Sequence, residues 1–184
     1  MNIIRVKVGL IGDSSCGKTS IINQLVKKTF NSAYQTTLGI EHQTYEIKIK
    51  KDHEYTVQFH ILDLTGFSVF RDLIESHIKE CNVIMYVYNI TDVKSFESVK
   101  LWKESIANLI NHECLEYIVG NKIDLERKIA VDDNSINNAC KQLNCDSFKV
   151  SALQAKGIDE MFTKIGNKYY YEYVNYLNNL KKLN

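Results

Sequence analysis

The chain has 184 residues, of which 45% are hydrophobic, and its 23 basic and 22 acidic side chains leave a net charge of +1. This length predicts one domain, residues 1–184, that can bury a substantial core without disulfides or metals. The balanced charge argues against nucleic acid or an anionic membrane as a direct partner, and the absence of proline with only eight glycines excludes collagen-like and linker-rich architectures.

Apolar runs and polar segments alternate along the chain and predict strands that alternate with helices. Strands are expected at 3–11, 45–49, 55–61, 82–90, 115–119 and 147–151, and helices at 17–28, 93–110, 133–143 and 157–178. The polar turn between the second and third strands indicates a β-hairpin, so one strand pair is antiparallel. The pattern predicts an α/β fold with a six-stranded, mostly parallel sheet and helices on both faces. A ligand would bind beyond the carboxyl ends of the strands.

The cysteines and the chain ends bear on localisation. Five cysteines form no Cys-x-x-Cys pair, and this pattern fits a reducing compartment. Residue 2 is not glycine, the chain ends without a cysteine to prenylate, and no apolar run reaches 18 residues. We therefore expect a cytoplasmic protein without a lipid anchor of its own. Peripheral membrane association would require a lipidated tail beyond this sequence or recruitment by a partner.

The first predicted strand is followed by the segment Gly12-Asp13-Ser14-Ser15-Cys16-Gly17-Lys18-Thr19. It has the pattern G-x-x-x-x-G-K-[ST] between a strand and a helix, which is typical of a phosphate-binding loop. Its backbone N–H groups and the helix N-terminus favour an anion. Lys18 can reach the outer phosphates, and the Thr19 hydroxyl can ligate Mg²⁺. For Cys16, a redox switch is one interpretation, and a buried small side chain is the favoured one.

A second motif, Asn121-Lys122-Ile123-Asp124, follows the fifth predicted strand. The Asp124 carboxylate can accept from N1–H and the 2-amino group of guanine, whereas adenine offers neither donor there. Asn121 would brace the loop, and the stem of Lys122 would cover one face of the base. Ser151-Ala152, after the last strand, can offer a backbone N–H to the guanine carbonyl. A guanine nucleotide is therefore favoured, and a P-loop ATPase or nucleotide kinase is the disfavoured alternative.

These motifs, with Asp63-x-x-Gly66 between them, occur in the order and spacing of the Ras superfamily of small GTPases, which the chain resembles from about residue 3 to residue 178. The segments GDSSCGKT and MYVYNITDVKSFESVKLWKESI look most like the Rab branch. The resemblance implies a P-loop NTPase fold and a monomeric molecular switch that binds GTP or GDP with Mg²⁺, hydrolyses GTP and serves vesicle trafficking. It also implies effector, exchange-factor and activating proteins that contact switch regions 31–42 and 64–79.

The resemblance assigns further roles by position. Thr19, Thr37 and Asp63 would hold Mg²⁺, Thr37 only while a γ-phosphate is present and Asp63 through water. The Gly66 N–H would bond the γ-phosphate, and Gly66 and Lys18 would take part in catalysis. Loss of that phosphate would release both switch regions. The remaining expected nucleotide contacts are Ser14, Ser15, Cys16, Gly17, Ser20, Phe30, Tyr34, Asn121, Lys122, Asp124, Leu125, Ser151, Ala152 and Leu153.

Phe67 is the main departure from the family pattern. It stands where the family usually has a glutamine that orients the attacking water. Because its ring has no donor or acceptor, we expect slow intrinsic hydrolysis or dependence on an activating protein. Thr65, or a glutamine supplied by a partner, could substitute. The alternatives are a GTP-loaded binding scaffold that barely hydrolyses, and a simple hydrophobic contact for partners.

Three smaller departures concern the base and the partners. Leu153 replaces the usual lysine of the last loop, which could loosen nucleotide retention. Asn89 stands where an aspartate is common. His42, Leu62 and His77 occupy the positions of an aromatic trio that Rab-type proteins present to effectors, so effectors of ordinary Rab proteins are not expected to bind.

Overall fold

The computed structural model describes residues 2–33, 36–37, 39–50, 54–64, 71–110 and 113–183. Within these ranges the elements follow in the order β1 (Asn2–Ile11), α1 (Lys18–Lys27), β2 (Ile40–Lys50), β3 (Glu54–Leu64), α2 (Arg71–Ile78), β4 (Val83–Asn89), α3 (Val93–Ile106), β5 (Leu115–Asn121), α4 (Asp133–Leu143), β6 (Asp146–Lys149) and α5 (Ile158–Leu183). Short 3-10 turns follow α3 (η2, Ala107–Leu109) and β5 (η3, Glu126–Lys128).

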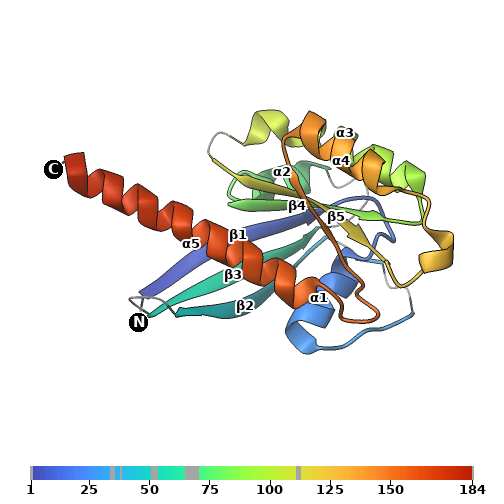
Figure 1. Cartoon of the computed structure of the whole chain (residues 1–184), viewed down its shortest axis with the longest axis horizontal. Helices are drawn as coiled ribbons and strands as arrows, with labels where there is room; N and C mark the ends of the chain where they lie inside the picture. The colour runs from blue at the N-terminus through green and yellow to red at the C-terminus, as the bar shows by residue number, and fades with distance from the viewer. Residues whose placement is uncertain are drawn as a thin grey trace.

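The strands form one six-stranded sheet in the order β2-β3-β1-β4-β5-β6 (Figure 1). β2 and β3 are antiparallel, and every other neighbouring pair is parallel. The mostly parallel sheet with one antiparallel pair is thus confirmed. The central strand β4 is apolar at nearly every position, because both of its faces are covered.

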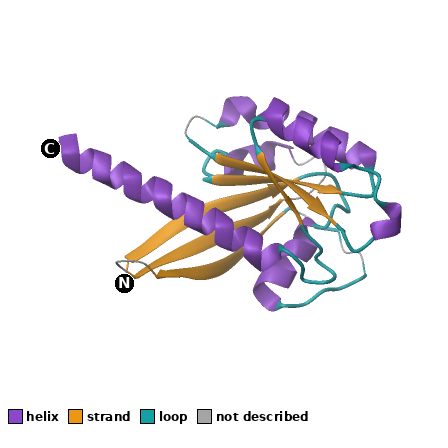
Figure 2. Ribbon diagram, viewed as in Figure 1, coloured by secondary structure: helices purple, strands orange, loops and turns teal. Residues whose placement is uncertain are grey.

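Helices cover both faces of the sheet, as predicted (Figure 2). One core cluster joins the sheet to α1 and α5, through side chains such as Leu25 and Phe162. A second cluster joins the opposite face to α2, α3 and α4, through Ile74, Val99 and Ile136. Each parallel strand ends in a loop that leads into a helix on one face of the sheet, so these loops lie together at the carboxyl ends of the strands.

Some boundaries differ from those predicted. α2 was not expected, although Ile74 and Ile78 lie four residues apart and are both buried. An eight-residue helix contains too few turns to show a clear apolar period, which explains the omission. β2 begins at Ile40, before the alternating pattern becomes visible. α5 continues to Leu183, and its C-terminal part extends past the sheet (Figure 1). None of the described helices combines the length and apolar character needed to cross a membrane.

Candidate nucleotide site

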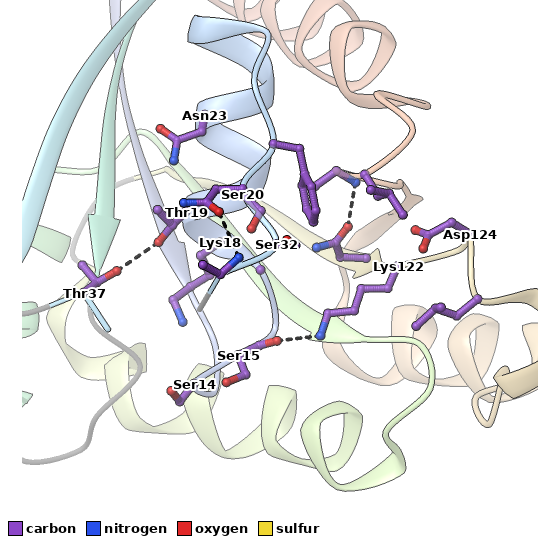
Figure 3. Close-up of a pocket in the computed structure, with 18 residues that line it drawn as sticks. Ser14, Ser15, Lys18, Thr19, Ser20, Asn23, Ser32, Thr37, Lys122 and Asp124 are labelled. Carbon is purple, nitrogen blue, oxygen red and sulfur yellow. Dashed lines mark hydrogen bonds between the residues drawn. The ribbon is translucent and has the colours of Figure 1, made fainter. Parts of the chain in front are cut away.

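A cavity of about 450 Å³ lies where the loops after β1, β5 and β6 meet the segment that follows α1 (Figure 3). Most of the predicted contacts line it. They are Ser14, Ser15, Gly17, Lys18, Thr19, Ser20, Phe30, Thr37, Asn121, Lys122, Asp124, Leu125, Ala152 and Leu153. The predicted residues Cys16 and Ser151 are buried beside this cavity and contact its lining through hydrogen bonds.

Four lining residues were missed from the sequence: Asn23, Asn31, Ser32 and Ala33. Asn23 lies one helical turn after Thr19 and Ser20, so its position on α1 was an available signal. The other three directly follow Phe30 and carry no distinctive motif.

Two glycines allow the phosphate loop to pack tightly against its neighbours. At Gly17 the backbone has φ 93°, and a Cβ atom would lie 2.3 Å from Asn121 Nδ2. At Gly12 φ is 151°, and a Cβ atom would lie 2.0 Å from the backbone oxygen of Val87 on β4. A side chain at either position would displace the loop. The curvature therefore depends on glycine, as a backbone cradle for an anion requires.

Lys18 places its ammonium group inside the curve of this loop. The residue is only 6% exposed. Its Nζ donates to the backbone oxygens of Gly12 at 2.7 Å and of Asp13 at 3.0 Å. The loop thus combines a buried positive charge with the N-terminus of α1, and both features favour phosphate.

Three oxygen-bearing side chains meet at one end of the cavity. Thr19 Oγ1 donates to Asp63 Oδ2 at 2.5 Å and lies 3.0 Å from Thr37 Oγ1. Asp63 is 2% exposed, and its Oδ1 has no hydrogen-bond partner within the described ranges. Burial raises the pKa of Asp63, and the bond from Thr19 opposes this shift. An unpaired buried carboxylate oxygen beside two hydroxyls fits Mg²⁺, which prefers oxygen ligands.

Asn121 connects three loops at the opposite end of the cavity. It is 1% exposed, its Nδ2 donates to the Cys16 backbone oxygen at 3.0 Å, and its Oδ1 accepts from Ala152 N at 3.2 Å. The phosphate loop, the β5 loop and the β6 loop are therefore held in one arrangement. Such buried bonds are costly to break, because each would leave a polar group unpaired.

The neighbouring side chains complete this network. The Ser151 hydroxyl donates to Asp124 Oδ1, which orients the carboxylate. Lys122 Nζ donates to the Ser15 backbone oxygen at 2.8 Å, so its stem lies along the cavity (Figure 3). The exposed apolar side chains Phe30, Leu125 and Leu153 also line this end and offer a surface for a flat ring.

The chain is similar to proteins of a known family over most of its length. The model of the Ras family matches residues 7–171. The chain is 30% identical to the Ras-related protein Rab-1C of Dictyostelium discoideum, over 88% of this chain and 79% of that protein. It is 31% identical to the Ras-related protein RabH of the same organism, over 86% and 78% of the two chains. It is 30% identical to the Ras-related protein Rab-13 of Rattus norvegicus, over 86% and 77%.

The chain belongs to the Ras family. It is a Rab-like small GTPase with the P-loop GTPase fold, and the cofactors of this family are GTP or GDP and Mg²⁺. The carboxylate, the two hydroxyls and the glycine cradle described above are compatible with both cofactors. Of the switch residues assigned by resemblance, Thr37 and Asp63 lie together, whereas Tyr34, Thr65, Gly66 and Phe67 fall outside the described residues.

The interswitch surface of this Ras-family chain differs from the expected one. Leu62 is 2% exposed and belongs to the second core cluster, so it cannot form part of an exposed trio with His42 and His77. His42 is exposed, and its ring centroid lies 5.6 Å from that of His60. Partial burial, then the charges of His42 and two nearby cations, lower the pKa of His60.

Two other sequence questions receive structural answers. Cys16 is 1% exposed, and burial raises the pKa of its thiol, so the interpretation as a buried small side chain is favoured. Asn89 ends β4, and its Oδ1 accepts from both the backbone N and the hydroxyl of Thr91. An aspartate carboxylate could accept the same two bonds, which explains why asparagine is tolerated there.

Proposed function

We propose that this protein is a molecular switch that cycles between GTP-bound and GDP-bound states in membrane trafficking, with slow intrinsic hydrolysis. The observation that carries the proposal is the position of Asn121, whose buried side chain joins the phosphate loop to both base-side loops around one cavity. A nucleotide is the ligand class that needs a phosphate cradle and a base pocket at this spacing.

Each side chain has a defined task in this proposal. Asp124 accepts from the guanine N1–H and 2-amino groups. The Ser151 hydroxyl, which donates to the same carboxylate, holds it in place. Lys18 and the loop backbone bind the phosphates. Thr19, Thr37 and Asp63 hold Mg²⁺, which when bound neutralises phosphate charge.

Thr37 connects the nucleotide to the partner surface. It lies at the end of the 31–37 segment, and its hydroxyl reaches Thr19 at 3.0 Å. A contact made only with a γ-phosphate present would order this segment, and its loss would release it. Regulators and effectors would then distinguish the two states through regions 31–42 and 64–79. We also propose a cytoplasmic location, with membranes reached through a partner or a lipidated tail.

The rate of GTP hydrolysis tests this proposal, because Phe67 stands where the family usually has the glutamine that orients the attacking water. Single-turnover GTP hydrolysis should proceed at or below about 10⁻⁴ s⁻¹ in the wild type, the scale of an unassisted small GTPase. Phe67→Gln restores an amide that can orient water and should raise the rate about tenfold. Phe67→Leu is the matched control, because it changes the ring but adds no polar group. If Phe67→Gln hydrolyses no faster than Phe67→Leu, this position does not limit the chemistry.

A GTP-loaded scaffold is the second candidate, and the apolar Phe67 favours it. Such a protein would keep its partners engaged because hydrolysis rarely ends the signal. Bound GTP that survives overnight incubation with Mg²⁺ would favour the scaffold, whereas conversion to GDP would favour the switch.

A further inference from the structure

A side chain of α3 contacts the phosphate loop. Trp102 is the only tryptophan of the chain, and its ring packs against the second core cluster. Its indole Nε1 donates to Asp13 Oδ1 at 2.7 Å, although the two residues are 89 positions apart. The bond therefore joins α3, which packs on one face of the sheet, to the phosphate loop that follows β1.

Asp13 is an unfavourable residue for a phosphate-binding loop, because a carboxylate repels phosphate. Yet the lining of the cavity described above includes its neighbours Ser14 and Ser15 and not Asp13 itself. The backbone oxygen of Asp13 accepts from Lys18 Nζ, while its side chain accepts from Trp102. The backbone thus faces the phosphate-binding lysine, and the negative charge is bonded to α3.

We propose that Trp102 is a positioning residue that keeps the Asp13 carboxylate away from the bound phosphates; this rests on the proposed nucleotide function. A hydrogen bond to a carboxylate is stronger than one between neutral groups, and the packed ring fixes where the N–H can point. Without this bond the carboxylate can rotate toward the phosphates. Repulsion between like charges at short range then speeds nucleotide release.

The prediction can be tested by dissociation of a fluorescent GDP analogue. Trp102→Phe keeps most of the ring but removes the N–H, and it should release the analogue about tenfold faster than the wild type. Asp13→Asn keeps an acceptor and removes the charge, so it should release no faster than the wild type. In the Asp13→Asn background, Trp102→Phe should change the rate less than twofold, because no charge remains to be held.

Two controls separate positioning from packing. Phe96→Leu trims another aromatic side chain of α3 that packs against the same cluster. Since the Phe96 side chain has no N–H to donate to Asp13, the effect of Phe96→Leu should not depend on the residue at position 13. The tenfold effect of Trp102→Phe should also shrink as salt rises from 0.05 to about 1 M, because salt screens repulsion between charges. An effect of equal size with aspartate and asparagine at position 13 would mean that Trp102 only packs.

The bond itself can be checked without altering Trp102, in case Trp102→Phe does not fold. The ¹H–¹⁵N spectrum of the nucleotide-free protein contains one indole cross-peak, because the chain has one tryptophan. Asp13→Ala should shift this peak and speed its hydrogen exchange, whereas Asp13→Asn should preserve the slow exchange. Identical indole peaks in the wild type and Asp13→Ala would overturn the inference. Failure of the wild type to bind any guanine nucleotide would instead overturn the proposed function, and the positioning role with it, whereas the bond between Trp102 and Asp13 would still be seen in the indole peak.

Discussion

The two sides of the nucleotide cavity are built differently. On the base side, Asn121 connects the loops through two buried hydrogen bonds to Cys16 and Ala152. On the switch side, Thr19, Thr37 and Asp63 meet, but one buried oxygen of Asp63 has no partner among the described residues. On the base side, Asn121 therefore finds its hydrogen-bond partners within the protein. On the switch side, the Asp63 oxygen could bind a metal ion.

This difference matches the division of work in a switch. A base site should bind with the same geometry in both nucleotide states, and internal hydrogen bonds give it that geometry in advance. A switch site must change when one phosphate is lost, so part of its bonding has to come from the ligand. The predictions below compare the two sides, from the largest expected effect to the smallest.

Asp124→Asn should have the largest effect. The new amide presents an N–H to the guanine donors, and a site built around specific hydrogen bonds rejects a mismatched base strongly. We expect GDP to bind at least 100-fold more weakly, while a xanthine nucleotide, with a carbonyl at C2, gains affinity. Competition between the two nucleotides measures this change. Glu126→Gln, an exposed acidic neighbour, is the control; equal losses in both variants would contradict the role of Asp124.

Removal of Mg²⁺ should act only through the switch side. Chelation should speed GDP release from the wild type by about 10- to 100-fold, because the phosphates lose a cation. In Asp63→Asn the same chelation should change release by less than threefold. The matched control is Glu41→Gln, since Glu41 lies opposite Asp63 in the β2–β3 register. A wild-type response in Asp63→Asn would show that the metal is held elsewhere.

Leu153→Lys should strengthen nucleotide binding at the base side, with a smaller effect than the two changes above. Leu153 is exposed at the cavity rim, and a lysine stem with a charge would cover one face of the base. We expect GDP release to slow about threefold, measured with the same fluorescent analogue. Gln154→Lys adds an equal charge on the adjacent exposed residue. Equal slowing in both variants would point to general attraction for phosphate instead.

His60→Gln should give the smallest effect, a change in the pH dependence of stability. His60 lies on β3, away from both sides of the nucleotide cavity. Its folded pKa is lowered, so the unfolded chain binds the proton more readily. The wild type therefore loses stability as pH falls through the ordinary histidine pKa toward the folded value, and His60→Gln does not. The difference in pH dependence between the two proteins should be small, and thermal unfolding at pH 5 and pH 8 measures it. A loss of the same size in His60→Gln would assign the effect to another group.

Local motifs predicted most of the cavity, because loops that follow parallel strands meet at one sheet edge. The phosphate loop, Asn121 and Asp124 could be placed from spacing alone. The burial of Leu62 could not, since Leu62 packs in a cluster that includes α2, a helix too short to show a clear period. The bond between Trp102 and Asp13 was also invisible, because nothing in either segment indicates how α3 lies relative to β1.

The nucleotide carried by the purified full chain tests the central claim most directly. The protein should be denatured after gel filtration in Mg²⁺ buffer, and the released nucleotide separated and quantified by HPLC. A site with a complete base side and a metal-dependent switch side predicts close to one guanine nucleotide per chain, with no adenine nucleotide. Recovery of ATP or ADP, or failure to retain GDP after loading, would contradict the account.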